Sequence, residues 1–375
     1  MRTTSFKRHF PPIPDPIYIS GMPIPPLYGH EGIRNRLVGA IASGRLPQAL
    51  LLEGPRGVGK QRLGLWLAQA LVCERPVNGR GREKGEPCGE CQPCRLVLNA
   101  SHPDVHWFVP VEPAKKGADA DKQVDLAAEA LAEQLAARRE RRLYEPPSGL
   151  ASHGIASVRL MLRRLALKPA LGRHKVFLIG DAERLVPQTG AEAAANALLK
   201  ALEEPPADTV FVLTSSEPDA LLPTILSRVV RVRVARNADS IVAAFAQREL
   251  GLKSQRDIAE RVTSADGSIG KLLASGEGAS GTGQPAEAFL GAVAGGAVQR
   301  YGFALRQTPF QARGGFTAML DGLLEQLRAQ ARAGGDTARA VEAIAHTLDA
   351  RELAQGNVNP QLVTAVLADE LAELK

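Results

Sequence analysis

The sequence predicts an α/β domain with a doubly wound parallel sheet, followed by two smaller helical domains. Three observations support this prediction. Between residues 27 and 236, short apolar runs alternate with helical patterns, which is typical of βαβ units. A glycine-rich loop directly follows the first apolar run. From residue 237 onwards the patterns are helical, and 375 residues are enough for two or three domains.

Five apolar runs of four or five residues are the expected strands. They lie at 49–52, 105–109, 176–179, 210–213 and 229–232. Each run is mostly apolar on both faces, which predicts strands that are covered by helices on both sides. Because aromatic residues make up only 4% of the chain, we expect a core built from Leu, Val, Ile and Ala side chains.

The clearest helix is expected near 191–204. Its apolar stripe is formed by Ala195, Leu198, Leu199 and Leu202, and the pair Pro205–Pro206 ends it. A helical insertion is expected at 111–150, with Asp121, Asp125, Glu129 and Glu133 early and Arg138, Arg139, Arg141 and Arg142 late. This order of charges complements a helix dipole and indicates a solvated surface helix. A basic face that contacts DNA is the alternative.

The other segments are assigned by composition. Residues 1–26 are expected to form a flexible Pro-rich extension, and 276–285 a Gly-rich linker. Residues 237–275 and 286–375 are expected to form separate helical domains, the second with a stripe of Leu320, Leu323, Leu324 and Leu327.

Charge and hydropathy exclude some classes of protein. No apolar run reaches the roughly 18 residues of a membrane span, and the N-terminus lacks the apolar core of a secretion signal. A net charge of +6 permits contact with nucleic acid without predicting it. The four cysteines all lie between 73 and 94, which favours a metal site in a reducing compartment, so a cytoplasmic location is expected.

The loop after the first strand has the pattern of a phosphate-binding loop. Gly54, Gly57, Gly59 and Lys60 precede a helical pattern, in the strand–loop–helix context that lets backbone N–H groups bind phosphate oxygens. Lys60 would reach the outer phosphates. The next residue is Gln61, where a Ser or Thr hydroxyl would normally bind Mg²⁺. An amide is longer and suits a small octahedral ion poorly.

A second acidic motif is also altered. Two adjacent carboxylates are expected after the strand at 176–179, one near Mg²⁺ and one that polarises the attacking water. Gly180 stands in the first position and Asp181 in the second. Asp181 is alternatively a turn or helix-cap residue. Both changes predict that the chain can hold ATP or ADP but does not hydrolyse it.

Cys73, Cys88, Cys91 and Cys94 follow the spacing C-x14-C-x2-C-x2-C. Four thiolates match the closed tetrahedral shell of structural zinc, which leaves no open position for catalysis. An iron–sulfur cluster and buried free thiols are the alternatives. His102 and His106 lie nearby, but because four thiolates suffice they are interpreted as ordinary polar residues.

Several motifs occur together in a characteristic order. They are the loop region 45–60, the four cysteines, and the segments at 101–104, 196–206 (NALLKALEEPP), 217–218, 223–228 and 357–362. With these motifs, the sequence resembles the delta-prime subunits of the bacterial DNA polymerase III clamp loader. The resemblance extends over about 27–375 and is weak across 111–150 and 276–310.

This resemblance implies an AAA+ protein with a zinc module at 73–94. According to this resemblance, residues 27–236 form the AAA+ α/β domain, residues 237–275 form a helical lid, and residues 286–375 form a helical collar that is used for oligomerisation. It further implies a pentameric hetero-oligomer with the delta and gamma/tau subunits, which places a sliding clamp on primed DNA. Delta-prime subunits are usually the rigid, non-hydrolysing member, which agrees with the altered motifs.

The resemblance also assigns a role to Arg228. Arg228 matches the Ser-Arg-Cys motif, in which the arginine acts in trans on the ATP of a neighbouring motor subunit, although Val229 replaces the cysteine. A lid arginine that senses nucleotide is expected within 267–270, where this chain has Gly270. Two other hypotheses are an ATPase in its own right, because Lys60 is retained, and a zinc-dependent DNA-binding module.

Overall fold

The structure is a computed structural model. It describes residues 24–77, 85–112, 119–140, 151–186, 192–276, 283–309, 315–332, 334, 336–355 and 358–374. The predicted flexible extension lies outside the described residues up to position 23. Ile24, which the prediction places in that extension, is 8% exposed and packs into the main hydrophobic cluster, so the ordered part begins before residue 27.

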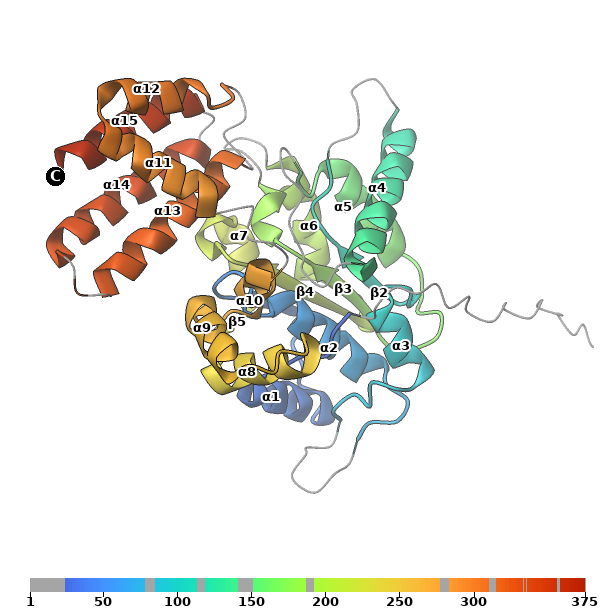
Figure 1. Cartoon of the computed structure of the whole chain (residues 1–375). Helices are drawn as coiled ribbons and strands as arrows, with labels where there is room; N and C mark the ends of the chain where they lie inside the picture. The colour runs from blue at the N-terminus through green and yellow to red at the C-terminus, as the bar shows by residue number, and fades with distance from the viewer. Residues whose placement is uncertain are drawn as a thin grey trace, which may run out of the picture.

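The α/β part is built on one parallel sheet of five strands in the order β2-β3-β4-β1-β5 (Figure 1). The strands are β1 (Ala49–Glu53), β2 (Val105–Phe108), β3 (Lys175–Ile179), β4 (Thr209–Ser215) and β5 (Val230–Arg233). All five predicted strands are therefore confirmed. Because β4 lies between β1 and β3, the ends of these three strands meet at one edge of the sheet.

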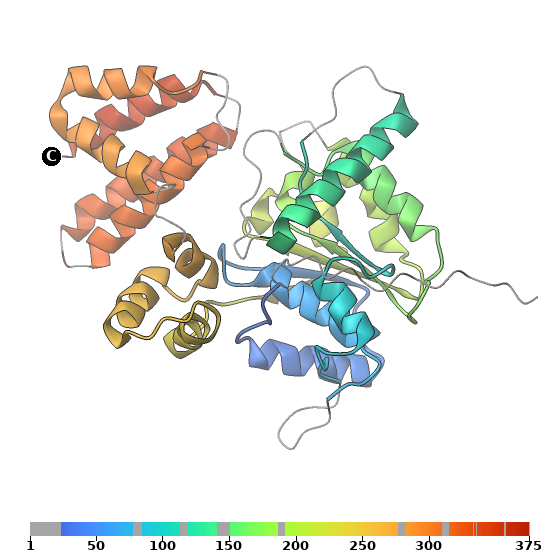
Figure 2. The same cartoon turned by 45° about the vertical axis from the view of Figure 1, so that its right-hand side comes forward.

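Helices cover both faces of this sheet, which confirms the predicted doubly wound α/β fold (Figures 1 and 2). The helices of this part are α1 (Glu31–Ala42), α2 (Lys60–Val72), α3 (Gln92–Leu98), α4 (Ala120–Glu140), α5 (Ile155–Leu165), α6 (Ala193–Glu203) and α7 (Pro223–Leu226), with short 3-10 turns η1 (Ala182–Leu185) and η2 (Pro218–Ala220). In both views α1, α2 and α3 lie on one side of the sheet, and α5 and α6 lie on the other.

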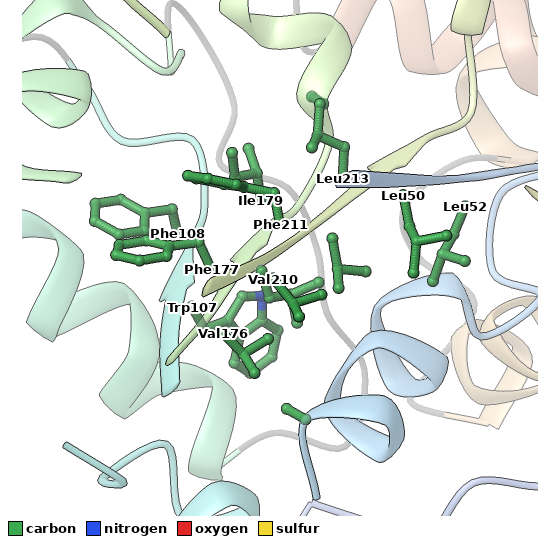
Figure 3. Close-up of a cluster of buried hydrophobic side chains, with 14 of the residues drawn as sticks. Leu50, Leu52, Trp107, Phe108, Val176, Phe177, Ile179, Val210, Phe211 and Leu213 are labelled. Carbon is green, nitrogen blue, oxygen red and sulfur yellow. The ribbon is translucent and has the colours of Figure 1, made fainter. Parts of the chain in front are cut away.

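Three phenylalanines add to the predicted aliphatic core. Phe177 and Phe211 are register partners on β3 and β4, and their ring centroids lie 5.2 Å apart. Phe108 on β2 stacks on Phe177 at 6.4 Å (Figure 3). All three are fully buried. The low aromatic content therefore did not reveal that three of the ten phenylalanines lie together on one face of the sheet.

Two expectations about burial are wrong. β5 is the edge strand, bonded only to β1, and Val230 is 49% exposed, so this strand is not covered on both faces. The helix α4 is not simply a solvated surface helix, because Val124 and Leu131 are buried in the main cluster. Even Arg138 from its basic end is 7% exposed.

The remaining helices form two further hydrophobic clusters. The first group is α8 (Asp239–Glu249), α9 (Gln255–Ala265) and α10 (Ile269–Gly276), and the second is α11 (Gly283–Gly295), α12 (Ala297–Leu305), α13 (Gly315–Arg332), α14 (Thr337–Gln355) and α15 (Pro360–Glu373). Because Gly276 and 283–285 are helical, the predicted linker is restricted to 277–282, which lies outside the described residues. Within the described part of the chain, none of the helices is both long and apolar enough to span a membrane.

Candidate functional site

The phosphate-binding loop connects β1 to α2, as the sequence predicts. Gly54, Gly57 and Gly59 all have positive φ angles, at 154°, 74° and 101°, which a residue with a side chain rarely adopts. A Cβ atom on Gly54 would collide with the carbonyl oxygen of Val234 behind the loop. The glycines are therefore needed for the conformation of the loop itself, in addition to any contact they make with a ligand.

The ammonium group of Lys60 is bonded within the protein. Its Nζ donates to the carbonyl oxygens of Gly54 (2.8 Å) and Pro55 (2.7 Å) and to Ser216 Oγ (2.9 Å). An ammonium group has three protons, so these three hydrogen bonds use all of its donors. Burial lowers the pKa of Lys60 to about 8, and the carboxylates of Glu183 and Asp181 offset part of that effect. The side chain that would hold the outer phosphates is thus directed into its own loop.

Gln61 and Gly180, which stand at the predicted position of the magnesium ligands, lie against each other. The end of the Gln61 side chain lies against Gly180, where an added Cβ would meet the Gln61 amide at 2.8 Å. Arg138 from α4 donates from Nη1 to Gln61 Oε1 at 2.7 Å, and its guanidinium stacks over the Trp107 ring at 4.7 Å. A neutral amide and a cation therefore occupy the place where a hydroxyl and a carboxylate would bind Mg²⁺.

Carboxylates remain beside this position. Asp181 has a left-handed φ of 51° at the start of η1, as the helix-cap alternative suggests, but its side chain makes no cap hydrogen bond. Glu183 Oε1 accepts the backbone N–H of Ser216 at 3.3 Å. Burial raises the pKa of Glu183, and the neighbouring Asp181 raises it further. These carboxylates are the electrostatic partners of Lys60, a role that phosphate oxygens would otherwise take.

A buried histidine fixes the backbone next to them. His153 Nε2 lies 2.7 Å from the carbonyl oxygen of Gly180, so the ring donates from this nitrogen. Burial lowers the pKa of His153 to about 4, which keeps the ring neutral at pH 7. His153 thereby holds Gly180 against Gln61.

The helix α10 and the residue before it contact the phosphate-binding loop. The backbone N–H of Gly270 donates to the carbonyl oxygen of Gly57 at 2.9 Å, and Ser268 Oγ donates to that of Arg56 at 3.2 Å. A Cβ on Gly57 would collide with Ser268 Oγ. Gly270, where a nucleotide-sensing arginine is expected, thus forms a direct backbone contact with the loop.

The fit between Gln61 and Gly180 gives a prediction. Gly180→Asp should lower the free energy of unfolding by about 1–2 kcal/mol, because the displaced Gln61 loses its hydrogen bond with the buried Arg138. The double variant Gln61→Ser/Gly180→Asp should recover most of this loss, since serine vacates the space. Urea unfolding of the unchanged chain, Gln61→Ser, Gly180→Asp and the double variant measures the coupling free energy between positions 61 and 180.

Gly154→Asp is the matched control. Nothing lies within 4 Å of a Cβ at Gly154, and the residue is the N-cap of α5, where aspartate is favourable. Its stability should be unchanged or higher. Additive effects of Gln61→Ser and Gly180→Asp would contradict the proposed fit.

The four cysteines come together as predicted. Their Sγ atoms all lie within 4.8 Å of one another, with Cys73–Cys88 at 3.7 Å and Cys73–Cys91 at 3.9 Å. Four sulfurs about 2.3 Å from a tetrahedral ion are about 3.8 Å apart, so the geometry fits such an ion. Cys73 ends α2 and Cys91 precedes α3, so a metal would join two helices.

Arg228 belongs to a separate surface region. Its Nη2 and Nε form an ion pair with Glu203 of α6, and Nη1 donates to the carbonyl oxygen of Thr224 at 2.7 Å. Its side chain is 29% exposed. Val229, in place of the motif's cysteine, is buried, as expected for a residue that packs.

A chain of ion pairs connects the loop to α13 and α14. Arg351 contacts Asp321 at 2.6 Å and also Glu217, and Asp321 contacts Arg56 at 3.3 Å. Burial alone would lower the pKa of Arg351, but Asp321 and Glu217 outweigh it and raise the pKa. No sequence pattern predicts this network, because Arg56 is 265 residues from Asp321 and Glu217 is 134 residues from Arg351, although Asp321 and Arg351 are only 30 residues apart.

Several known proteins are similar in sequence to this chain. The family model described as "DNA polymerase III, delta subunit" matches residues 29–238. The delta-prime subunit of Yersinia pestis is 33% identical over 193 residues, which cover 52% of this chain and 43% of the relative. The delta-prime subunit of Escherichia coli K12 is 29% identical over 239 residues, covering 64% and 57%. The Escherichia coli K12 tau subunit is 30% identical over 200 residues, covering 53% and 23%. The matched part is thus about half the length of the delta-prime relatives.

Proposed function

The chain belongs to the DNA polymerase III delta-prime family, and from this premise we propose that it is the non-hydrolysing stator of a clamp loader. In this proposal it assembles with delta and gamma/tau subunits into a pentameric ring. The ring places a sliding clamp on primed DNA, and the motor subunits supply ATP hydrolysis.

One observation supports the stator role above the others, namely that this chain's own side chains occupy the magnesium position. Gln61 lies against Gly180, and Arg138 places a guanidinium on the Gln61 amide. A divalent ion is repelled by a fixed cation and finds no hydroxyl at Gln61 or carboxylate at Gly180. Any ATP or ADP in the loop would also have to displace the bonds of Lys60 to Gly54 and Pro55.

We assign the catalytic contribution of this chain to Arg228. A surface guanidinium that follows a short helix, with Glu203 as its partner, is free to exchange that partner for a phosphate on another subunit. Neutralising phosphate charge in trans is an established use of arginine in phosphoryl transfer. The residue would complete a neighbour's active site while its own chain performs no hydrolysis.

We assign zinc to the four cysteines as a structural ion. The closed thiolate shell would supply no open coordination position, so its contribution is to hold the end of α2 and the start of α3 together. Gln69 on α2 donates to the carbonyl oxygen of Cys94 on α3 at 3.1 Å, a contact between the same two helices that the ion would join.

An ATPase assay of the purified chain tests the stator proposal. The chain alone should show no Mg²⁺-dependent ATP turnover, whereas a mixture with delta and motor subunits should hydrolyse ATP. Turnover by the isolated chain that disappears in Lys60→Ala would instead establish it as an ATPase. Strongly salt-dependent DNA affinity that is lost in Cys91→Ala would favour the DNA-binding module.

A further inference from the structure

Glu86 lies just before the group of three cysteines at 88–94. Its carbonyl oxygen accepts the backbone N–H of Val77 at 2.9 Å, and the two residues form an isolated antiparallel bridge. Two residues later, the backbone N–H of Cys88 donates to Cys73 Sγ at 3.4 Å. Because only Pro87 separates Glu86 from Cys88, a shift of Glu86 would move Cys88 relative to Cys73.

The side chain of Glu86 is bound to α1. Arg34 Nη2 forms an ion pair with Glu86 Oε1, and the two side chains are only 19% and 11% exposed. The preceding residue, Gly85, has a φ of 104°, and a Cβ there would lie 3.2 Å from Val38 Cγ1 of α1. Arg34 and Val38 are four residues apart and share one face of α1, so the segment before the cysteines packs on this face.

Arg34 also contacts the helix that Cys73 follows. Its guanidinium carbon lies 5.5 Å from the centroid of the Trp66 ring on α2, and Trp66 is 6% exposed. Arg34 thereby connects α1 both to α2 and to the segment before Cys88, the two parts of the chain that supply the four sulfurs. An ion pair that is mostly removed from water contributes more than an exposed one, and loss of one partner leaves the other charge poorly solvated.

We propose that Arg34 is a positioning residue for the zinc ion assigned to the four cysteines. The Arg34–Glu86 ion pair and a bound ion would both hold the segment from Glu86 to Cys94 against the end of α2, so each favours the other. Arg34 acts through Glu86 and is not itself a ligand. This inference rests on the zinc assignment under the proposed function. No sequence pattern indicates it, because Arg34 and Glu86 are 52 residues apart.

The zinc affinity of the reduced full chain tests this inference. Metal is removed with a chelator, and Zn²⁺ is then titrated in the presence of a competing chelator. Arg34→Met removes the charge and should weaken zinc binding about tenfold, the lower end of the effect of residues that orient metal ligands. Arg34→Lys keeps the charge and should retain most of the affinity. Arg36→Met, at an exposed position of the same helix, should bind zinc like the unchanged chain.

A double-mutant cycle tests whether Arg34 acts through Glu86. Glu86→Ala removes the carboxylate but keeps the backbone bond to Val77, and it should weaken zinc binding to a similar extent. The double variant Arg34→Met/Glu86→Ala should bind zinc no more weakly than the weaker single variant, because both changes remove the same interaction. Losses of affinity that add in the double variant, or an unchanged zinc affinity of Arg34→Met, would overturn the role of Arg34.

Elemental analysis of the unchanged chain separates failure of this inference from failure of the zinc assignment. One zinc ion per unchanged chain, together with an unaltered zinc affinity of Arg34→Met, would refute the role of Arg34 alone. An unchanged chain that neither contains nor takes up Zn²⁺ would refute the zinc assignment and this inference with it.

Discussion

Replacing Arg228 by alanine is expected to lower ATP hydrolysis at the neighbouring active site by about 10³-fold, the lower end of the effect of an arginine supplied in trans. In the proposed role, the side chain would contribute positive charge to the transferred phosphate, and no other residue of the Ser227–Val229 motif carries a positive charge. Stability should change little, because the Arg228–Glu203 pair lies at the surface and such pairs contribute about 0–1 kcal/mol. Single-turnover hydrolysis by the assembled ring measures the effect.

Arg231→Ala is the matched control. Arg231 is also exposed and paired with a carboxylate, that of Glu53 at 2.7 Å, but it lies on β5 outside the motif. It should leave hydrolysis unchanged. Ring assembly with Arg228→Ala is checked by size-exclusion chromatography. Normal hydrolysis in an assembled ring containing Arg228→Ala would remove the proposed role in trans.

The second large effect is expected at the cysteines. The purified chain should contain one zinc ion, and Cys91→Ser should lose it and lower the free energy of unfolding by more than about 3 kcal/mol. The physical reason is that Cys73 follows α2 and Cys91 precedes α3, so loss of the ion would remove a connection between these two helices. Elemental analysis and chemical unfolding provide the two measurements.

Glu90→Ala controls for changes in the same turn, because Glu90 is exposed and its carboxylate is not part of the cysteine cluster. The Glu90→Ala variant should retain the zinc ion and have an unchanged free energy of unfolding. Iron in the purified protein would support the cluster alternative, and absence of any metal would support free thiols.

The fold was predictable because its signals are local. Each β-strand is a short apolar run, and the stripe of Ala195, Leu198 and Leu202 is buried on α6 as its spacing predicts. Exposure of β5 was not predictable, since Val230 looks apolar in sequence and only the strand order places it at the edge. The burial of α4 was missed because its charged residues are numerous and its apolar face is narrow.

The site was predictable only where it follows one contiguous motif. Gly54, Gly57, Gly59, Lys60 and the four cysteines were identified from spacing. Arg138 is 77 residues from Gln61, so no pattern in the sequence joins them. Ser216 directly follows β4 and Ser268 directly precedes α10, and serine is too common to signal a contact with the loop. Glu183 lies two residues beyond Asp181 and could have been found as a second acidic candidate.

The ion pairs from Arg56 through Asp321 and Arg351 to Glu217 also set how the C-terminal helices respond to electrolyte. Their side chains are between 24% and 57% exposed, so dissolved ions can weaken each pair. The ion pairs that join α13 and α14 to the part of the chain around the sheet are therefore expected to weaken as the salt concentration rises. The packing within each hydrophobic cluster involves apolar side chains, so it should depend much less on ionic strength.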